Sequence, residues 1–203
     1  MVDAATLAGF ALTSLLIELT PGPNMAYLAL LAATEGRRPG YAAVAGVALG
    51  LAVVGVAAAL GLAALIAASP FAYQALRWAG VGYLLWLAWE GWRGTTQADQ
   101  FAKAGSSLAV YFRRGLITNL LNPKAAVFYV SILPGFLMSG ASVFDVITLS
   151  AIYVAVATAV HTAIVTGAGT ARAWLGNPAR ERIIRRMLAL ALVGVAIWVV
   201  WKT

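Results

Sequence analysis

Apolar residues dominate the chain in six long runs, and short polar segments separate these runs. The runs cover approximately residues 7–33, 41–67, 71–92, 115–138, 146–168 and 187–201, of which the last is short. A helix needs roughly 20 predominantly apolar residues to cross about 30 Å of hydrocarbon. The pattern therefore predicts an all-α integral membrane protein, with six transmembrane helices in a single domain over residues 1–203. Residues 93–112 are expected to form its one sizeable loop.

Composition supports the membrane interpretation and excludes other classes of protein. Hydrophobic residues make up 62% of the 203 residues and charged residues only 10%, well under the roughly 25% of a soluble domain. With no cysteine and one histidine, the sequence does not provide disulfides, thiolate nucleophiles or cysteine-based zinc sites. The glycine patterns that bind phosphates or dinucleotides are absent as well. We therefore expect no enzyme, no cofactor and no resident metal.

The positions of the basic residues predict how the chain is oriented. There are 14 Lys and Arg against 7 Asp and Glu, an excess of +7 that would suit an acidic partner. Most of the basic residues, however, lie in alternate connections between the apolar runs: Arg37, Arg38, Arg93, Lys103, Arg113, Arg114, Arg172, Arg180, Arg182, Arg185 and Arg186. Cytoplasmic loops of membrane proteins retain Lys and Arg. We therefore expect these connections in the cytoplasm, both termini outside it, and no nucleic acid partner.

Two of the apolar runs contain a segment that cannot continue as a regular helix. The first run reads TPGPN over residues 20–24, and the fourth reads NLLNPK over residues 119–124. Proline removes an amide donor and glycine adds backbone freedom, so both helices should break. The breaks lie about half a chain apart, in runs that cross the membrane in opposite directions. This relation predicts two inverted three-helix repeats, about 1–92 and 113–203, although simple proline kinks are an alternative.

Broken helices at matching places in inverted halves indicate the binding site of a secondary transporter. The half-helix after a break offers free amides to an anion, and the half-helix before it offers free carbonyls to a cation. A zwitterionic amino acid carries both charges. The predicted substrate-binding residues are those of the two breaks: Pro21, Gly22, Pro23, Asn24, Asn119, Asn122, Pro123 and Lys124. For the asparagines, a purely local role in satisfying freed backbone groups is the alternative.

Two ionisable residues inside the apolar runs are candidates for proton coupling. Glu18 lies near the middle of the first run and His161 lies inside the fifth. Ionisable side chains at such depth are expensive and by default mark functional sites. The structural alternatives are a static ion pair between Glu18 and Lys124, and a histidine that only hydrogen bonds between helices. Two roles are open for Lys124, neutralising Glu18 or meeting a substrate carboxylate.

Five motifs extend the prediction to a known family. They read LTPGPN, EGRRPG, GVALG, GVGYLLWLAW and RGLITNLLNPKAAVF, over residues 19–24, 35–40, 46–50, 80–89 and 114–128. Together they resemble the lysine exporter and homoserine/threonine exporter (LysE/RhtB) translocator family. The resemblance implies a bacterial inner-membrane carrier that exports amino acids or related metabolites, driven by the proton gradient. Many relatives carry a histidine where this chain has Val53, Val54 and Gly55, so Glu18 or His161 would replace it.

Two other classes of function stay open at this point. A cation or metal exporter on the same scaffold would need several membrane carboxylates, and only Glu18 is placed for it. A non-transporting membrane scaffold would not require two matched breaks. Glycines spaced as G-x-x-x-G at Gly46 and Gly50 favour close helix packing and leave room for a homodimer. Tryptophans near the predicted helix ends, such as Trp89 and Trp92, are typical of membrane interfaces.

Overall fold

The computed structural model describes residues 2–20, 22–61, 69–93, 108–137, 141–174 and 178–202. Within these ranges all regular structure is helical, which confirms the predicted all-α class. The helices are α1 (Ala4–Glu18), α2 (Pro23–Thr34), α3 (Arg37–Ala59), α5 (Pro70–Arg93), α7 (Ala109–Leu120), α8 (Pro123–Val127), α9 (Val143–Trp174) and α10 (Pro178–Lys202). A π-helical turn, Phe128–Ile132, and a 3-10 turn, Leu133–Phe136, follow α8.

The long helices are apolar enough for a membrane. Among the described residues, two helical segments can span a bilayer by length and composition, Arg37–Ala59 and Val143–Thr170. The pair α1 and α2, bent by 62° at its break, would be a third span. Shorter apolar segments lie within α5 and α10. The membrane class is thus supported, whereas the number of six spans stays a prediction.

Several helices extend beyond the apolar runs from which they were predicted. The last two runs, 146–168 and 187–201, lie inside longer helices, α9 and α10. In the same way α7 begins at Ala109, inside the segment 93–112 that was predicted to be a loop. These boundaries were wrong because the ends of the helices are polar and so do not extend the apolar runs. Arginine, which is common in these ends, is nevertheless a good helix former. The rest of that predicted loop, residues 94–107, lies outside the described residues.

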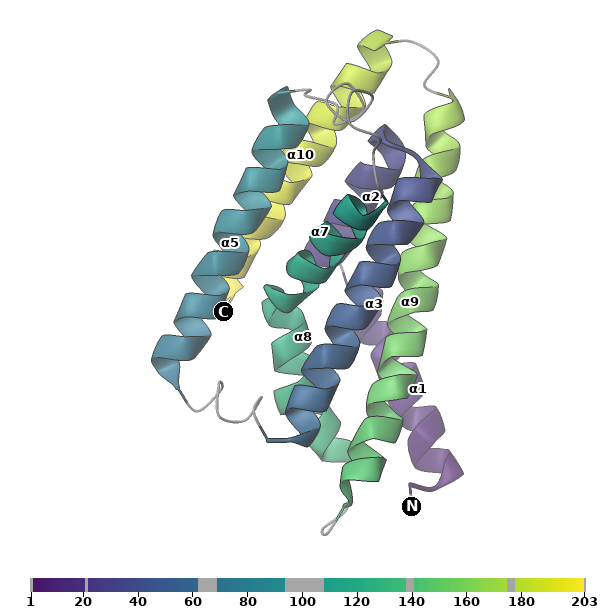
Figure 1. Cartoon of the computed structure of the whole chain (residues 1–203), viewed down its shortest axis with the longest axis vertical. Coiled ribbons are helices and arrows are strands. Elements are labelled where there is room, and N and C mark those ends of the chain that lie inside the picture. The colour runs from purple at the N-terminus through teal and green to yellow at the C-terminus, as the bar shows by residue number, and fades with distance from the viewer. Residues whose placement is uncertain are drawn as a thin grey trace.

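The helices form an elongated bundle in which successive long helices run in opposite directions (Figure 1). Helix α3 packs against α7 and α9, while α9 also contacts α1 and α2. Helices α5 and α10 pack against each other at one side of the bundle (Figure 1). The first residues of α3, α7 and α10 and the last residues of α5 and α9 lie toward the upper half of this view. The ends that carry most of the described arginines therefore gather on one side.

Both predicted breaks are present. Helix α1 ends at Glu18 and α2 begins at Pro23, after Gly22 in an extended conformation. Helix α7 ends at Leu120 and α8 begins at Pro123. In each case a proline occupies the first turn of the new helix, where its missing N–H costs nothing and its fixed φ is favourable. Pro23 and Pro123, which cannot continue a preceding helix, therefore each begin the next half-helix.

The glycine face of α3 packs against α7 within the same chain. A Cβ added at Gly46 would overlap the carbonyl oxygen of Phe112, and one added at Gly115 would overlap that of Ala43. A Cβ at Gly50 would lie 2.8 Å from the side-chain nitrogen of Asn119. The close packing predicted from the glycine spacing is therefore confirmed, and this face is occupied by α7.

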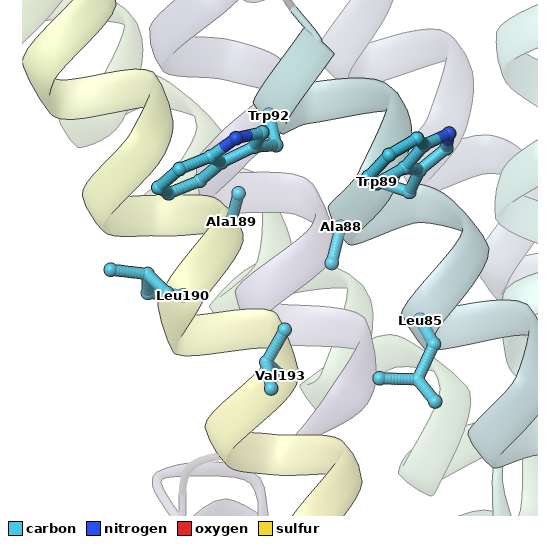
Figure 2. Close-up of a pocket in the computed structure, with 7 residues that line it drawn as sticks. All are labelled: Leu85, Ala88, Trp89, Trp92, Ala189, Leu190 and Val193. Atoms are coloured by element: carbon cyan, nitrogen blue, oxygen red, sulfur yellow. The ribbon is translucent and has the colours of Figure 1, made fainter.

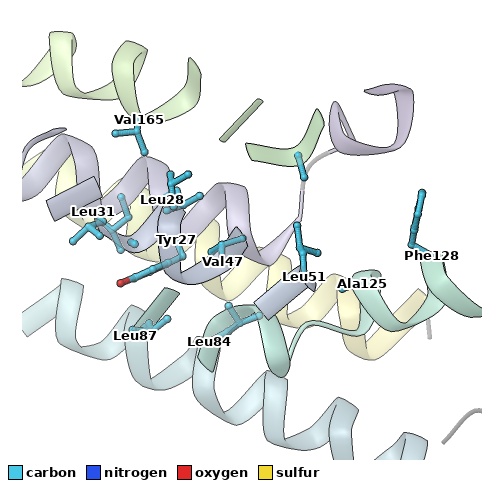
Figure 3. Close-up of a cluster of buried hydrophobic side chains, with 14 of the residues drawn as sticks. Tyr27, Leu28, Leu31, Val47, Leu51, Leu84, Leu87, Ala125, Phe128 and Val165 are labelled. Atoms are coloured by element: carbon cyan, nitrogen blue, oxygen red, sulfur yellow. The ribbon is translucent and has the colours of Figure 1, made fainter. Parts of the chain in front are cut away.

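The hydrophobic core lies between these helices. Leu28, Val47 and Val165 bring α2, α3 and α9 together, and each is almost fully buried (Figure 3). Phe128, just after α8, belongs to the same cluster. Packing of this kind fixes the half-helices rigidly and so positions the side chains at their ends.

Candidate functional site

Glu18 is the last residue of α1 and is the centre of a buried polar cluster. Its side chain is only 6% exposed, although Glu18 is charged in its ordinary state and stands at the end of a helix. The Tyr153 hydroxyl of α9 donates a 2.8 Å hydrogen bond to Oε1 of Glu18. Hydrogen bonds to a charged group are worth about 1.5–3 kcal/mol. The carboxylate is therefore held by a side chain of α9, a helix that packs against α1.

Lys124 reaches the same carboxylate from the second break. Its Nζ lies 3.8 Å from Oε1 of Glu18 and donates a 2.9 Å hydrogen bond to the carbonyl oxygen of Thr20. That carbonyl lies two residues after the end of α1, within the break, where the backbone has left the helix. Gly22 makes room for the lysine, because a Cβ there would lie 3.3 Å from Cδ of Lys124. The Lys124 ammonium group thus joins the second break to the first, through a hydrogen bond to the Thr20 carbonyl and a longer ion pair with Glu18.

His161 completes the cluster on α9. Its Nε2 lies 3.4 Å from Oε2 of Glu18, and its side chain is 1% exposed. Among the described residues, Nδ1 has no hydrogen-bond partner. Since Tyr153, Ala157, His161 and Val165 repeat every four residues, they share one buried face of the helix. Both carboxylate oxygens of Glu18 therefore face α9.

The asparagines divide into two kinds. Nδ2 of Asn24 donates a 2.9 Å hydrogen bond to Oδ1 of Asn119, which joins α2 directly to α7. Oδ1 of Asn24 and Nδ2 of Asn119 are buried and have no partner among the described residues. Oδ1 of Asn122, in contrast, accepts the backbone N–H of Lys124 and caps α8. The local role considered for the asparagines thus applies to Asn122.

The structure brings most of the predicted site residues to the two breaks. Glu18, His161 and Lys124 form one cluster, and Asn24 and Asn119 form a direct pair. The other predicted site residues border the breaks: Gly22, Pro23, Asn122 and Pro123. The side chain of Pro123 and the whole of Pro21 lie outside the described residues. The Glu18 cluster and the pair of Asn24 and Asn119 are therefore two polar groups within an apolar bundle.

Tyr153 is a member of the cluster that was not predicted from the sequence. Its ring stacks on Phe128 with centroids 3.7 Å apart, while its hydroxyl reaches Glu18. The available signal was its position eight residues before His161, on the same face of a helix. Among the described residues, no group of three or more His, Cys, Asp or Glu side chains is placed to hold a metal ion.

These features together define a class of protein. An all-helical chain with membrane-length apolar helices, two broken helices and ionisable groups buried at the breaks is typical of a membrane transporter. The chain belongs to the LysE type translocator family, whose model matches residues 15–203. It is therefore a transporter and not an enzyme.

Individual relatives agree with this assignment. The chain is 30% identical over 179 residues to the homoserine/homoserine lactone efflux protein of Salmonella typhimurium, and the match covers 87% of each chain. It is 36% identical over 123 residues to the leucine efflux protein of an Enterobacter species, which covers 60% of this chain and 58% of that protein. An uncharacterized membrane protein of Pseudomonas aeruginosa is 33% identical over 144 residues, 66% of this chain and 67% of that one. No solved structure matches the chain.

Proposed function

We propose that the chain exports a small zwitterionic amino acid, or a closely related metabolite, across the bacterial inner membrane by proton antiport. The observation that carries the proposal is the cluster in which Lys124 and His161 meet the buried carboxylate of Glu18. The names of the relatives, which are efflux proteins for homoserine and leucine, support the class of substrate. The family resemblance supports the bacterial inner membrane as the location.

The substrate binds by exchanging partners with the ion pair of Glu18 and Lys124. Its carboxylate takes the Lys124 ammonium group, while its own ammonium group takes Glu18 and the carbonyl of Thr20. The 3.8 Å separation between Lys124 and Glu18 supports such an exchange, since it is longer than a direct hydrogen bond. Each charge then keeps a partner throughout, which matters because an unpaired charge in an apolar interior is costly.

Residues of the breaks shape the rest of this site. Asn24 and Asn119 have a buried acceptor and donor left over, which suit the polar groups of an amino acid. We place the backbone of Gly22, Pro23 and Asn122, between the half-helices, beside the substrate. The predicted site residues Pro21 and Pro123 belong to the same two segments of the sequence. Non-helical backbone at membrane depth is tolerated where it borders a polar cavity.

Coupling to protons follows from competition for one carboxylate. Glu18 binds either the substrate ammonium group or a proton, so release of one favours uptake of the other. His161, whose Nε2 lies 3.4 Å from Glu18, relays the proton, and the Tyr153 hydroxyl keeps the carboxylate in position. A histidine suits this role because a proton can be taken up at one ring nitrogen and released from the other.

Alternating access requires two halves that can move against each other. We assign α1, α2, α3 and α5 to one repeat and α7, α8, α9 and α10 to an inverted copy. The helix contacts support this pairing, because α3 packs on α7 while α9 packs on α1 and α2, and because α5 packs on α10. The six transmembrane spans then form one domain over residues 1–203, with residues 93–112 in the cytoplasm and both termini outside. A homodimer stays a prediction and needs a surface other than the Gly46 face.

A counterflow experiment with substrate analogues tests this site. Purified protein is reconstituted in vesicles loaded with unlabelled leucine or homoserine, and uptake of the labelled form is followed. The competitors are the same amino acid, its methyl ester, which lacks the carboxylate, and the matching hydroxy acid, which lacks the ammonium group. We expect only the intact zwitterion to compete well with the wild-type protein.

Two variants connect the analogues to the residues. Lys124→Met should reduce the advantage of the zwitterion over the ester, because the anchor for the carboxylate is gone. Asp3→Asn is the matched control, since Asp3 is an exposed helix cap and asparagine caps helices equally well. Equal competition by all three analogues with the wild-type protein would overturn the zwitterion site. Absence of any counterflow across a full amino acid panel would overturn the proposal that amino acids are the substrates.

A further inference from the structure

An apolar groove lies between α5 and α10 (Figure 2), and no residue of the two breaks is among those that line it. Its volume is about 280 Å³, near the lower end of the range for ligand pockets. Seven apolar or aromatic residues line it: Leu85, Ala88, Trp89, Trp92, Ala189, Leu190 and Val193. None of them belongs to the proposed substrate site. The groove therefore needs an explanation of its own.

The groove has a direction. Trp89 and Trp92 stand at one end, whereas Leu85 and Val193 lie toward the other (Figure 2). Leu190 is 57% exposed and Leu85 is 42% exposed, so the groove is open to the surroundings of the bundle. In a membrane those surroundings are acyl chains. The tryptophan end matches the level of the lipid headgroups, where tryptophan is enriched.

Two arginines cap the tryptophan end of the groove. The guanidinium carbon of Arg186, on α10, lies 5.0 Å from the ring centroid of Trp92 on α5. That of Arg93, in the last turn of α5, lies 5.3 Å from the ring of Trp89. Among the side chains that the structure describes, neither arginine forms an ion pair with a carboxylate. A guanidinium group stacked on a ring keeps its edge N–H groups available for an anion.

We propose that this groove binds one acyl chain of an anionic phospholipid, with the lipid phosphate at Arg93 and Arg186. The groove provides an apolar channel that ends at two positive charges, which complements a molecule with an apolar tail and an anionic head. Arginine binds phosphate in a bidentate geometry, and basic pockets between membrane helices recognise anionic headgroups. The lipid would join the partners α5 and α10, which belong to different halves of the chain.

The chemistry of the groove favours a lipid over the other candidate occupants. An amino acid substrate needs polar partners for both of its charges, and the residues that line the groove are apolar. A second copy of the chain would cover the apolar residues, but it would leave the guanidinium groups of Arg93 and Arg186 without an anionic counterpart among the described side chains. A phospholipid satisfies both parts of the site with a single molecule.

Native mass spectrometry of the purified full chain, titrated with phosphatidylglycerol or phosphatidylcholine of identical acyl chains, tests this proposal. We expect tighter binding of phosphatidylglycerol to the wild-type protein. Arg93→Gln with Arg186→Gln should weaken phosphatidylglycerol binding about thirtyfold, because two basic side chains at the membrane surface are lost. Phosphatidylcholine binding should change much less.

The matched control replaces two exposed arginines elsewhere, Arg38→Gln with Arg113→Gln, and should bind phosphatidylglycerol as the wild type does. Val193→Phe fills the groove and should weaken the binding of both lipids.

Should the glutamine double variant fail to fold, Arg93→Lys with Arg186→Lys replaces it, because this variant keeps both charges. It is expected to bind phosphatidylglycerol more weakly than the wild type does but more tightly than Val193→Phe does. Equal phosphatidylglycerol binding by the two glutamine variants overturns the proposal. A dimer that Val193→Phe dissociates, with no lipid bound to the wild type, would assign the groove to a second copy instead.

Discussion

Replacing Gly46 with alanine should destabilise the bundle at the α3–α7 crossing. The added methyl group would overlap the carbonyl oxygen of Phe112 and lie 2.8 Å from the backbone nitrogen of Leu116. Both obstacles are backbone atoms, so the helices must separate rather than repack a side chain. Inserting a methyl group into a packed interior costs about 1–3 kcal/mol, and this geometry favours the upper end. Alanine returns about 1 kcal/mol through its helix propensity, which leaves a net loss of about 2 kcal/mol in the free energy of unfolding.

Thermal unfolding in mild detergent measures this loss. For a chain of this size, about 2 kcal/mol corresponds to a decrease of roughly 4–8 °C in Tm. Gly82→Ala on α5 is the matched control, because nothing lies within 4 Å of the Cβ it would add. That variant should gain up to about 1 kcal/mol from helix propensity. If Gly46→Ala is as stable as Gly82→Ala, the close backbone contact between α3 and α7 is not present in the protein.

Three further predictions concern the site and the topology. Tyr153→Phe removes the hydroxyl donor to Glu18 and should slow export under a pH gradient at least about tenfold, given the strength of a charge-assisted hydrogen bond; an unchanged initial rate would argue against a positioning role. Gly50→Ala should weaken substrate affinity in counterflow, because its methyl group would displace Asn119, and unchanged affinity would separate Asn119 from the site. Val2→Cys, in a chain without natural cysteine, should react with a membrane-impermeant maleimide from outside intact cells, whereas reaction only after permeabilisation contradicts the proposed orientation.

The breaks could be predicted because their causes are local. Proline and glycine act on their own backbone and on the preceding turn, so the motifs at residues 20–24 and 119–124 were sufficient. The helix boundaries were predicted less well, because the polar ends of α9 and α10 carry no apolar signal. Whether the two halves are inverted copies depends on tertiary packing, which neither motif determines.

The candidate site could be predicted only in part. Glu18 and His161 stood out because a titratable side chain in an apolar run is rare. Their meeting with Lys124 depends on how three distant segments pack, and local patterns do not contain that information. For Tyr153 the only sequence signal was its spacing of eight residues from His161, and a tyrosine in a membrane helix is as compatible with packing as with hydrogen bonding. The Thr20 carbonyl that accepts the Lys124 hydrogen bond is a backbone group, so no residue type in the sequence indicates its role.

The most direct test of the central claim is substrate efflux driven by an imposed proton gradient. Proteoliposomes loaded with the labelled amino acid that counterflow identifies are diluted into buffer at equal or lower pH, with wild-type protein or Glu18→Gln. We predict that an inward proton gradient accelerates efflux by the wild type. Glu18→Gln should lose this acceleration, because glutamine cannot exchange a proton for the substrate ammonium group. Equal acceleration of both proteins would contradict proton coupling through Glu18.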